Sequence, residues 1–359
     1  MSEISRRDFL KTGAMAIGTL TLGGIASAAP ATQTEQSPPP RPAPHSDKSH
    51  TSPDKGARAM AKVYLTRDLS AAGVLKIYSK INAGIQGRTA IKFHSGEPKG
   101  PNLLPVEYLK ALQKNIPNSA LVECNVLYAG PRRRTASHRK TLKTNGFDFC
   151  PVDIMDAEGD AILPVKGLKA FLDKWHNTDP DKRPYTPGHH LTELAVGGHL
   201  LDYNSLVVYT HFKGHAMGGF GGSLKNISIG CASGDVGKMQ IHGKGWPTGK
   251  LFLERMVEGG KAIVDHFQGR MACINVLKNI SVDCDCDKNG APPTCRDIGI
   301  LGSTDVLAID KASVSLIYAL PAKERRDIVE RIESREGLRQ LEYMKTLGVG
   351  LDDYEVIEI

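Results

Sequence analysis

Two kinds of hydrophobic pattern alternate along the chain and predict its secondary structure. Short, continuous apolar runs predict β-strands at residues 61–67, 89–94, 119–126, 205–212, within 270–283 and 297–310, and at 354–359. Apolar residues that recur every three or four positions predict helices at 71–83, 105–116, near 135–145, at 190–202 and over 323–347. Strands that alternate with helices predict an α/β fold with a mainly parallel sheet and flanking helices, either as one body or as two lobes around a cleft.

Residues 1–28 have the pattern of an export signal. The segment Ser5–Lys11 (SRRDFLK) resembles the twin-arginine motif, and Ala26-Ser27-Ala28 forms a small-x-small cleavage site after an apolar run. This run, residues 12–25, is too short for a membrane span. We therefore expect export by the twin-arginine translocase to a periplasmic or extracytoplasmic location, without a stable membrane anchor. Because this route carries folded proteins, it favours a cofactor that is loaded before export.

Composition separates a linker from the folded part. Residues 29–59 are rich in Pro, Ser and Thr and nearly lack apolar residues, which predicts a disordered linker. Residues 60–359 remain as one α/β domain. The formal charge is +7, from 46 Lys and Arg against 39 Asp and Glu, and residues 130–143 are its one concentrated basic run. Since an exported protein rarely meets nucleic acid, we expect a small anionic ligand or a redox partner and no nucleic acid.

Polar residues gather after the predicted strands. In parallel sheets, ligands bind beyond the carboxyl ends of the strands. Lys92, His94 and Glu97 follow one strand and are candidate ligand-binding residues. His242 lies in a later loop and is a further candidate for the cleft.

The segment 210–234 carries the densest signal. His211, Lys213 and His215 alternate, so in an extended segment they share one face, and Lys225 falls in the first turn of a following helix. Histidines there could act as acid–base catalysts and lysines could stabilise an anion. Glycines before a helix let backbone N–H groups approach an anion, and the candidates are Gly219, Gly221 and Gly222. The alternative is a glycine-rich turn that only permits tight packing.

Three cysteines share one acidic loop, SVDCDCDKNGAPPTC. Cys284, Cys286 and Cys295 have the spacing C-x-C-x8-C, which matches neither bacterial ferredoxins nor zinc ribbons. Thiolates bind soft metals, so we expect a metal ion or an iron–sulfur cluster, with Cys231, His215 or a substrate as the fourth ligand. A disulfide that involves Cys295 and free reactive thiols are the alternatives. The other cysteines are expected in the core, at positions 124, 150 and 273.

Six segments in order resemble one known family. They are IKFHSGEP (91–98), CNVLYAG (124–130), THFKGH (210–215), GFGGSLKNISIGCASG (219–234), SVDCDCD (281–287) and RDIGILGSTDVLAIDKAS (296–313). The chain resembles the bacterial and archaeal domain-of-unknown-function family 362, described as iron–sulfur-centre or ferredoxin-associated proteins. The resemblance implies that Cys284 and Cys286 are a family feature and that Cys295 is not. Many relatives carry a ferredoxin-like insert after GCAS that this chain lacks, which weakens a claim of ferredoxin-type electron transfer.

These observations leave three functional hypotheses. The first is an exported metal- or iron–sulfur-binding protein with a redox or cofactor-linked role. The second is an enzyme that acts on a small anionic substrate through His and Lys chemistry, with or without a metal. The third is a non-catalytic binding protein with a structural disulfide.

Overall fold

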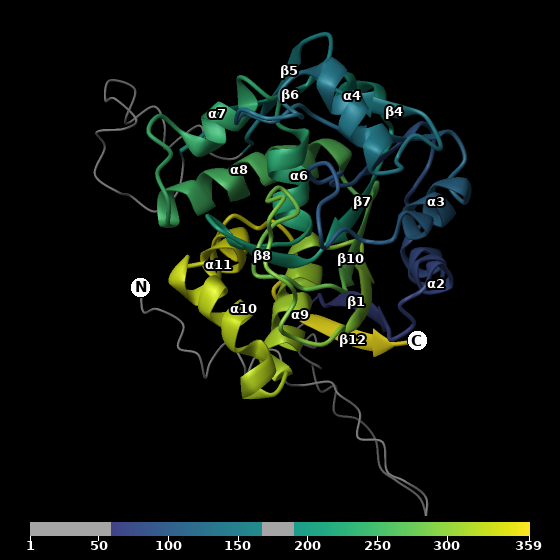
Figure 1. Cartoon of the computed structure of the whole chain (residues 1–359), viewed down its shortest axis with the longest axis vertical. Coiled ribbons are helices and arrows are strands. Elements are labelled where there is room, and N and C mark those ends of the chain that lie inside the picture. The colour runs from purple at the N-terminus through teal and green to yellow at the C-terminus, as the bar shows by residue number, and fades with distance from the viewer. Residues whose placement is uncertain (1–58, 167–189) are drawn as a thin grey trace, which may run out of the picture.

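The computed structural model describes residues 59–166 and 190–359, and in these ranges an eight-stranded sheet runs through the molecule (Figure 1). The predicted signal (1–28) and all but the last residue of the predicted linker (29–59) lie outside the described residues. The strands are β1 (Ala61–Thr66), β2 (Thr89–Lys92), β3 (Ser119–Glu123), β4 (Val152–Ile154), β7 (Ser205–His211), β10 (Met271–Leu277), β11 (Gly299–Ser303) and β12 (Tyr354–Glu358). Their order is β12-β1-β11-β10-β7-β2-β3-β4.

The sheet is mainly parallel, as the alternation of strands and helices predicted. Strands β10, β7, β2, β3 and β4 pair in parallel, and β11 pairs antiparallel with both of its neighbours. Every residue of β7 and β10 is buried. Strands covered on both faces need continuous apolar runs, which explains why these two have them.

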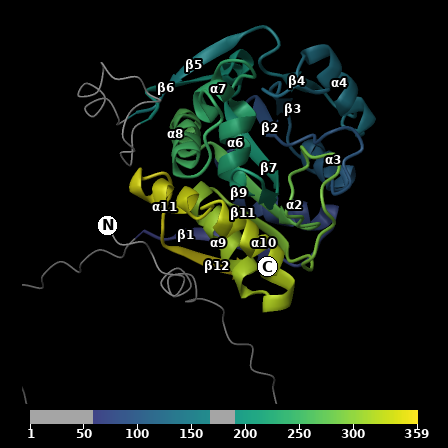
Figure 2. The ribbon, with the colours of Figure 1, turned by 60° about the vertical axis from the view of Figure 1, so that its left-hand side comes forward.

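Helices cover both faces of the sheet and create two separate cores (Figure 2). One face carries α2 (Ala71–Ile81), α3 (Val106–Lys114) and α4 (Thr135–Thr144). The other carries α6 (Ser223–Cys231), α8 (Lys250–Phe267) and α9 (Val306–Ala319), with α7 (Gly237–His242), α10 (Ala322–Ser334) and α11 (Arg339–Thr346) packed around them. Ile77, Ile91 and Leu109 belong to the first core, whereas Val208 and Leu224 belong to the second. Among the described residues, every helix is too short or too polar to cross a bilayer.

The helix predicted at 190–202 is wrong. The structure has a strand there, β6 (Glu193–Gly197), which pairs antiparallel with β5 (Asp160–Pro164), followed by the 3-10 helix η2 (Gly198–Asp202). Residues 194–197 are all buried, and a short buried apolar run fits a helix as well as a strand. The pairing with β5, which the local sequence does not show, selects the strand.

Two later segments combine more than one element. The segment 297–310, predicted as a strand, contains β11 and then the first turn of α9. Asp305 caps this helix, and its side chain accepts a hydrogen bond from the Ala308 amide at 2.8 Å. The segment 270–283 contains β10 and then the cysteine loop. In both segments further apolar residues follow the end of the strand, so the apolar run alone does not mark where the strand stops.

Candidate functional site

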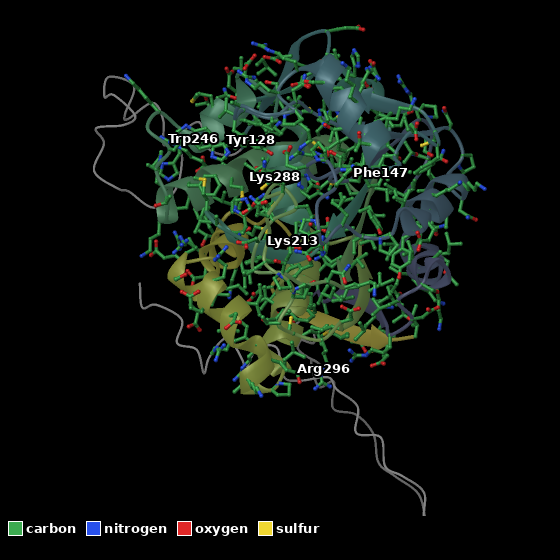
Figure 3. All side chains as sticks on the ribbon, in the orientation of Figure 1. Tyr128, Phe147, Lys213, Trp246, Lys288 and Arg296 are labelled. Atoms are coloured by element: carbon green, nitrogen blue, oxygen red, sulfur yellow. The ribbon has the colours of Figure 1, made fainter. Side chains whose placement is uncertain are left out.

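Four loops converge at the carboxyl edge of the sheet. They follow β2, β3, β7 and β10, which are neighbours in the order β10-β7-β2-β3. Parallel neighbours end at the same edge, so the loops that follow them meet there. Together with α6 and α7 they enclose a cavity of about 290 Å³. In Figure 3, the cavity residues Tyr128, Lys213 and Trp246 lie in the middle and left of the molecule, whereas Arg296 lies at its lower edge.

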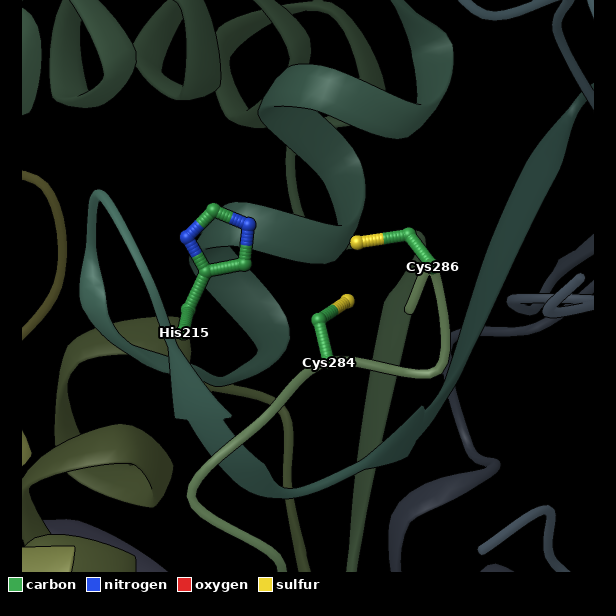
Figure 4. Close-up of side chains that lie close together, drawn as sticks. All are labelled: His215, Cys284 and Cys286. Carbon is green, nitrogen blue, oxygen red and sulfur yellow. The ribbon is translucent and has the colours of Figure 1, made fainter. Parts of the chain in front are cut away.

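Two sulfurs and one imidazole meet inside this cavity (Figure 4). The ligand atoms of His215, Cys284 and Cys286 all lie within 4.8 Å of one another. His215 is the last residue of β8 (Lys213–His215), which forms a hairpin with β9 (Gly219–Gly221), and the cysteines lie on the loop after β10. Gly214 lets the hairpin contact this loop, because a Cβ at that position would lie 2.2 Å from the Val282 carbonyl oxygen. The predicted meeting of the Cys-Asp-Cys pair with the segment that begins at His211 is therefore present.

The two cysteines differ in protonation. A hydrogen bond from Cys286 lowers the pKa of Cys284 well below its usual value, and the charges of Lys213 and Lys225 lower it further against the effect of burial. The same hydrogen bond raises the pKa of Cys286, and burial adds to this rise. Of the two, Cys284 is therefore the sulfur that loses its proton more readily, and Cys286 is the one that donates to it. A thiolate is both the nucleophilic and the metal-binding form of cysteine.

His215 is held in one tautomer by backbone groups. Its Nδ1 accepts hydrogen bonds from the amides of Met217 at 3.2 Å and Gly218 at 3.0 Å. Burial lowers the pKa of the ring well below its usual value, and Lys225 adds to this effect. The ring is therefore neutral, with its proton on Nε2. For Nε2 to bind a metal, the ring proton must move to Nδ1, and both hydrogen bonds from the Met217 and Gly218 amides must break. The two cysteines are therefore the firmer metal ligands.

Asp285, between the two cysteines, anchors their loop. Its carboxylate lies 2.9 Å from Nδ1 of His211 and 3.0 Å from Nζ of Lys213. Burial raises the pKa of Asp285, but the positive charges of His211 and Lys213 outweigh it and hold this pKa below its usual range. The other nitrogen of His211, Nε2, faces the carbonyl oxygens of Lys278 and Asn279 at 2.8 and 3.2 Å. His211 and Lys213, predicted as catalytic, are thus engaged in fixing the loop.

A second buried ion pair lies beside the thiolate. Lys92 Nζ is 2.9 Å from Glu123 Oε2, and Glu123 Oε1 accepts a hydrogen bond from the Ser95 amide at 2.8 Å. His94 lies between this pair and the cysteine loop, with Nε2 3.8 Å from Sγ of Cys284. Burial lowers the pKa of His94, so its ring is neutral. Lys92 and His94 therefore line the cavity as the sequence predicted.

Glu97 supports the site from outside the cavity. Its carboxylate accepts hydrogen bonds from Tyr128 at 2.8 Å and from Nε of Arg132 at 3.0 Å. Its amide donates to the Asp285 carbonyl at 2.8 Å, which ties the loop after β2 to the cysteine loop. Glu97 is thus placed to hold two loops together, and it does not line the cavity where a ligand would bind.

The anion site expected at the start of α6 is already occupied by the protein. Asp310 of α9 accepts hydrogen bonds from the amides of Ser223 at 2.7 Å and Leu224 at 2.9 Å. Burial raises the pKa of Asp310 to about 6. Gly222 makes room for this carboxylate, since a Cβ there would lie 2.4 Å from Oδ1. The expectation that backbone N–H groups bind an external anion is therefore wrong for this helix terminus.

The three glycines predicted to bind an anion have different places in the structure. Gly221 and Gly222 line the cavity, whereas Gly219 has a positive φ of 77° and packs against Gly337. Lys225 is in the first turn of α6, as predicted, and lines the cavity.

Cys231 and Cys295 lie away from the thiol pair. Neither lines the cavity; Cys231 is fully buried, and Sγ of Cys295 lies 3.7 Å from the Ile280 carbonyl oxygen. Burial raises the pKa of Cys295 to about 11 and that of Cys231 to about 12. All seven cysteines of the chain fall within the described ranges, and all are free thiols there. Cys124 and Cys273 are buried as predicted, but Cys150 is only half-buried.

Several cavity residues had no clear signal in the sequence. Glu123 and Lys238 stand in otherwise apolar or mixed segments, and only burial beside the cavity distinguishes them. Asp285 had a signal, because it separates the two cysteines, but its role as a counter-ion depends on two distant strands. Trp246 and Phe252 complete an aromatic wall with His242.

The fold and the site define an α/β protein with a thiol pair in a cationic cavity at the carboxyl edge of its sheet. Residues 89–315 match the model of a family described as a domain of unknown function, DUF362, and the chain belongs to this family. The matched range contains every residue that lines the cavity. No curated protein matches this chain.

Two solved structures resemble this one in fold. The lactate racemase apoprotein from Thermoanaerobacterium thermosaccharolyticum is 13% identical, with a TM-score of 0.39 over 70% of this chain and 56% of that one. A structural-genomics protein from Thermotoga maritima is 12% identical, with a TM-score of 0.37 over 75% of this chain and 57% of that one. This chain spans little more than half the length of either protein.

We expect Cys284 to be the first cysteine that iodoacetamide modifies at pH 7, since its lowered pKa makes it a thiolate. Between pH 9 and 7 its alkylation rate should fall less steeply than that of an ordinary cysteine, which slows about tenfold per pH unit below its pKa of about 8.5. Lys225→Gln should move the inflection for Cys284 to higher pH. Mass spectrometry of timed samples measures each site, with Cys295 as the internal control. Identical pH profiles for Cys284 and Cys295 would contradict the assignment.

Proposed function

We propose that this is an exported protein that binds a soft metal ion through Cys284 and Cys286, with a cofactor-linked role. The observation that carries the proposal is the convergence of these two sulfurs with a ring nitrogen of His215 to within 4.8 Å inside a cavity. Sulfur ligands favour soft or borderline ions such as Cu(I) and Zn(II).

The composition of the site favours a single ion over an iron–sulfur cluster. Clusters are usually held by four cysteine thiolates. Three described cysteines line the cavity, but only Cys284 and Cys286 belong to a group of ligand atoms close enough to share a metal ion. Cys124 lines the cavity apart from that group, and Cys231 and Cys295 lie elsewhere. A metal ion held by two thiolates keeps positions open for a third protein ligand or for an exogenous one.

Metal binding at this pair is coupled to the loss of a proton. Cys286 is a thiol that donates to the Cys284 thiolate, and both must be thiolates to ligate the ion. Lys213 and Lys225 add positive charge, which opposes an incoming cation until the second thiolate forms. We therefore expect affinity to rise with pH through the range in which Cys286 ionises.

Anaerobic titration with Co(II) tests the proposal. Binding to two thiolates should give a near-ultraviolet sulfur-to-cobalt charge-transfer band that saturates at one ion per chain, with proton release measured in a weak buffer. Zn(II) should displace the cobalt and remove the band. Analysis of iron and acid-labile sulfide in protein purified without oxygen tests the cluster alternative. A protein that gives no charge-transfer band and releases no protons with Co(II) does not bind metal at this pair.

Export is the second part of the proposal, and the Ser5–Lys11 motif and the cleavage site at Ala26–Ala28 support it. Arg6→Lys with Arg7→Lys should leave the protein in the cytoplasmic fraction. Cell fractionation checks this, and an unchanged distribution of the variant would count against twin-arginine export.

A further inference from the structure

We propose that the cavity has a second subsite, which binds a small planar carboxylate between Lys225 and Lys238 and against the rings of His242 and Trp246. This inference goes beyond the metal site. It rests on other residues of the same cavity and does not require a bound metal.

The first argument is the balance of charge inside the cavity. Lys92 and Lys213 line it, but each is neutralised by a buried carboxylate, Glu123 and Asp285 respectively. Lys225 and Lys238 also line it, and within residues 59–166 and 190–359 neither has a carboxylate within 4.0 Å. Lys238 is buried and Lys225 is half-buried, so an anionic ligand would stabilise the charge of Lys238 most and would add to the effect of the Cys284 thiolate on Lys225.

Lys238 is the more constrained of the two. It is 4% exposed, and its Nζ donates to the Ala232 carbonyl oxygen at 2.5 Å. This leaves Nζ with further protons to donate, because an ammonium group has three. Burial lowers the pKa of Lys238, which is what a cation that lacks a close anion should show. An anion in the cavity would restore the charged form.

The second argument is an aromatic wall of the cavity, formed by His242, Trp246 and Phe252. His242 lies 4.4 Å from the Trp246 ring and 5.1 Å from the Phe252 ring, measured between centroids, and it stacks on Phe252 at 19°. Trp246 is 41% exposed and has a left-handed backbone with φ of 54°, between Gly245 and Pro247. A bulky residue in this conformation is strained, and such strain concentrates at functional sites.

The third argument is an unsatisfied polar atom on the same wall. Nδ1 of His242 is buried and has no hydrogen-bond partner among the described residues. Buried polar atoms are nearly always hydrogen-bonded, and those that are not call for a ligand or a water. Burial, with Lys225 and Lys238, lowers the pKa of His242 to about 4, so at neutral pH its ring adds no charge and can hydrogen-bond a ligand.

The geometry favours a carboxylate over a phosphate. Phosphate sites usually combine helix N-terminal amides with cationic side chains, and here Asp310 already holds the first amides of α6. The cationic donors that remain, Lys225 and Lys238, are side chains. A volume of about 290 Å³ is at the lower end of ligand cavities, which limits the ligand to a small molecule. A flat, unsaturated body suits the wall formed by His242 and Trp246.

Benzoate is a suitable probe, and Trp246 reports on it. The chain has two tryptophans, so Trp175→Phe leaves Trp246 as the single emitter. In EDTA-treated protein, benzoate should quench this emission saturably at one molecule per chain, and calorimetry should give the same affinity. Benzamide, which has the same shape without the charge, and inorganic phosphate should bind at least about tenfold more weakly.

Lysine variants test the assignment of the anion site. Lys225→Gln removes a side chain that makes no ion pair among the described residues, so the fold should persist, which thermal unfolding checks. It should weaken benzoate about tenfold or more, and Lys238→Gln should do the same. Lys244→Gln, an exposed lysine of the α7–α8 loop that does not line the cavity, is the matched control and should bind benzoate as the parent does.

The outcomes separate this subsite from the metal site. Benzoate binding in EDTA with loss in both lysine variants supports the subsite whether or not Co(II) binds to the cysteines. Absence of saturable quenching, equal affinities for benzoate and benzamide, or unchanged binding in Lys225→Gln would each overturn it.

Discussion

Asp285→Asn is expected to lower the free energy of unfolding by about 3 to 5 kcal/mol at pH 7, because it removes the only carboxylate that Lys213 contacts among the described residues. Both partners are almost fully buried, so water cannot replace the lost charge. Asparagine has the same shape and can still accept one hydrogen bond from Lys213 or His211. The loss is therefore electrostatic, and urea unfolding measures it.

The loss of stability in Asp285→Asn should depend on pH, and the lowered pKa of Asp285 gives the direction of this dependence. The folded-state pKa of Asp285 is below its unfolded value, so this group stabilises the fold above about pH 4, the unfolded pKa of aspartate. This contribution disappears as the pH falls through the folded pKa. The difference in stability between the wild type and Asp285→Asn should thus shrink progressively below about pH 4.

Two further variants control this prediction. Asp287→Asn changes an exposed carboxylate of the same loop and should shift the unfolding free energy by less than about 0.5 kcal/mol. Lys213→Met in the Asp285→Asn background removes the unpaired cation and should restore part of the loss. If Asp285→Asn unfolds like the wild type, the carboxylate is not the counter-ion that the geometry indicates.

Replacing either cysteine of the pair by serine should weaken Co(II) and Zn(II) binding by more than about 100-fold. A hydroxyl oxygen is a hard ligand and stays protonated at neutral pH, so it cannot replace a thiolate on a soft ion. Removal of a direct ligand should exceed the 10- to 100-fold losses typical of groups that only orient a ligand. The charge-transfer band should also fall in intensity, because it counts the sulfurs bound to cobalt.

Cys295→Ser is the matched control, since it changes the third cysteine of the same loop at a position outside the cavity. Its metal affinity and spectrum should equal those of the parent. If Cys295→Ser lost metal and Cys286→Ser kept it, the ligands would be Cys284 and Cys295, and the loop would have to rearrange on binding.

Much of the fold could be predicted from hydrophobic periodicity. The strands that became β1, β2, β3, β7, β10, β11 and β12 were placed from apolar runs, and the parallel sheet followed from their alternation with helices. The segment 190–202 was placed wrongly because a short apolar run fits a helix or a strand. Only its pairing with β5 decides between them.

The site was predicted in part. Lys92, His94, His215, Lys225, Cys284 and Cys286 all line one cavity, because the ends of parallel strands share an edge. Their roles could not be predicted, since they depend on partners distant in the sequence. Asp285 engages His211 and Lys213, and Asp310 engages the start of α6, over separations of 72 to 87 residues.

The sequence by itself determined the α/β class, the carboxyl-edge location of the site and the pair of thiols, because these depend on local pattern and on the direction of the strands. Only the tertiary structure decided which charges remain unpaired. A lysine is neutralised by a carboxylate that folding brings within a few ångströms, and the Coulomb energy of a pair depends on that distance and on burial. Glu123 and Asp285 reach Lys92 and Lys213 in the folded chain, and no carboxylate of the described residues reaches Lys225 or Lys238.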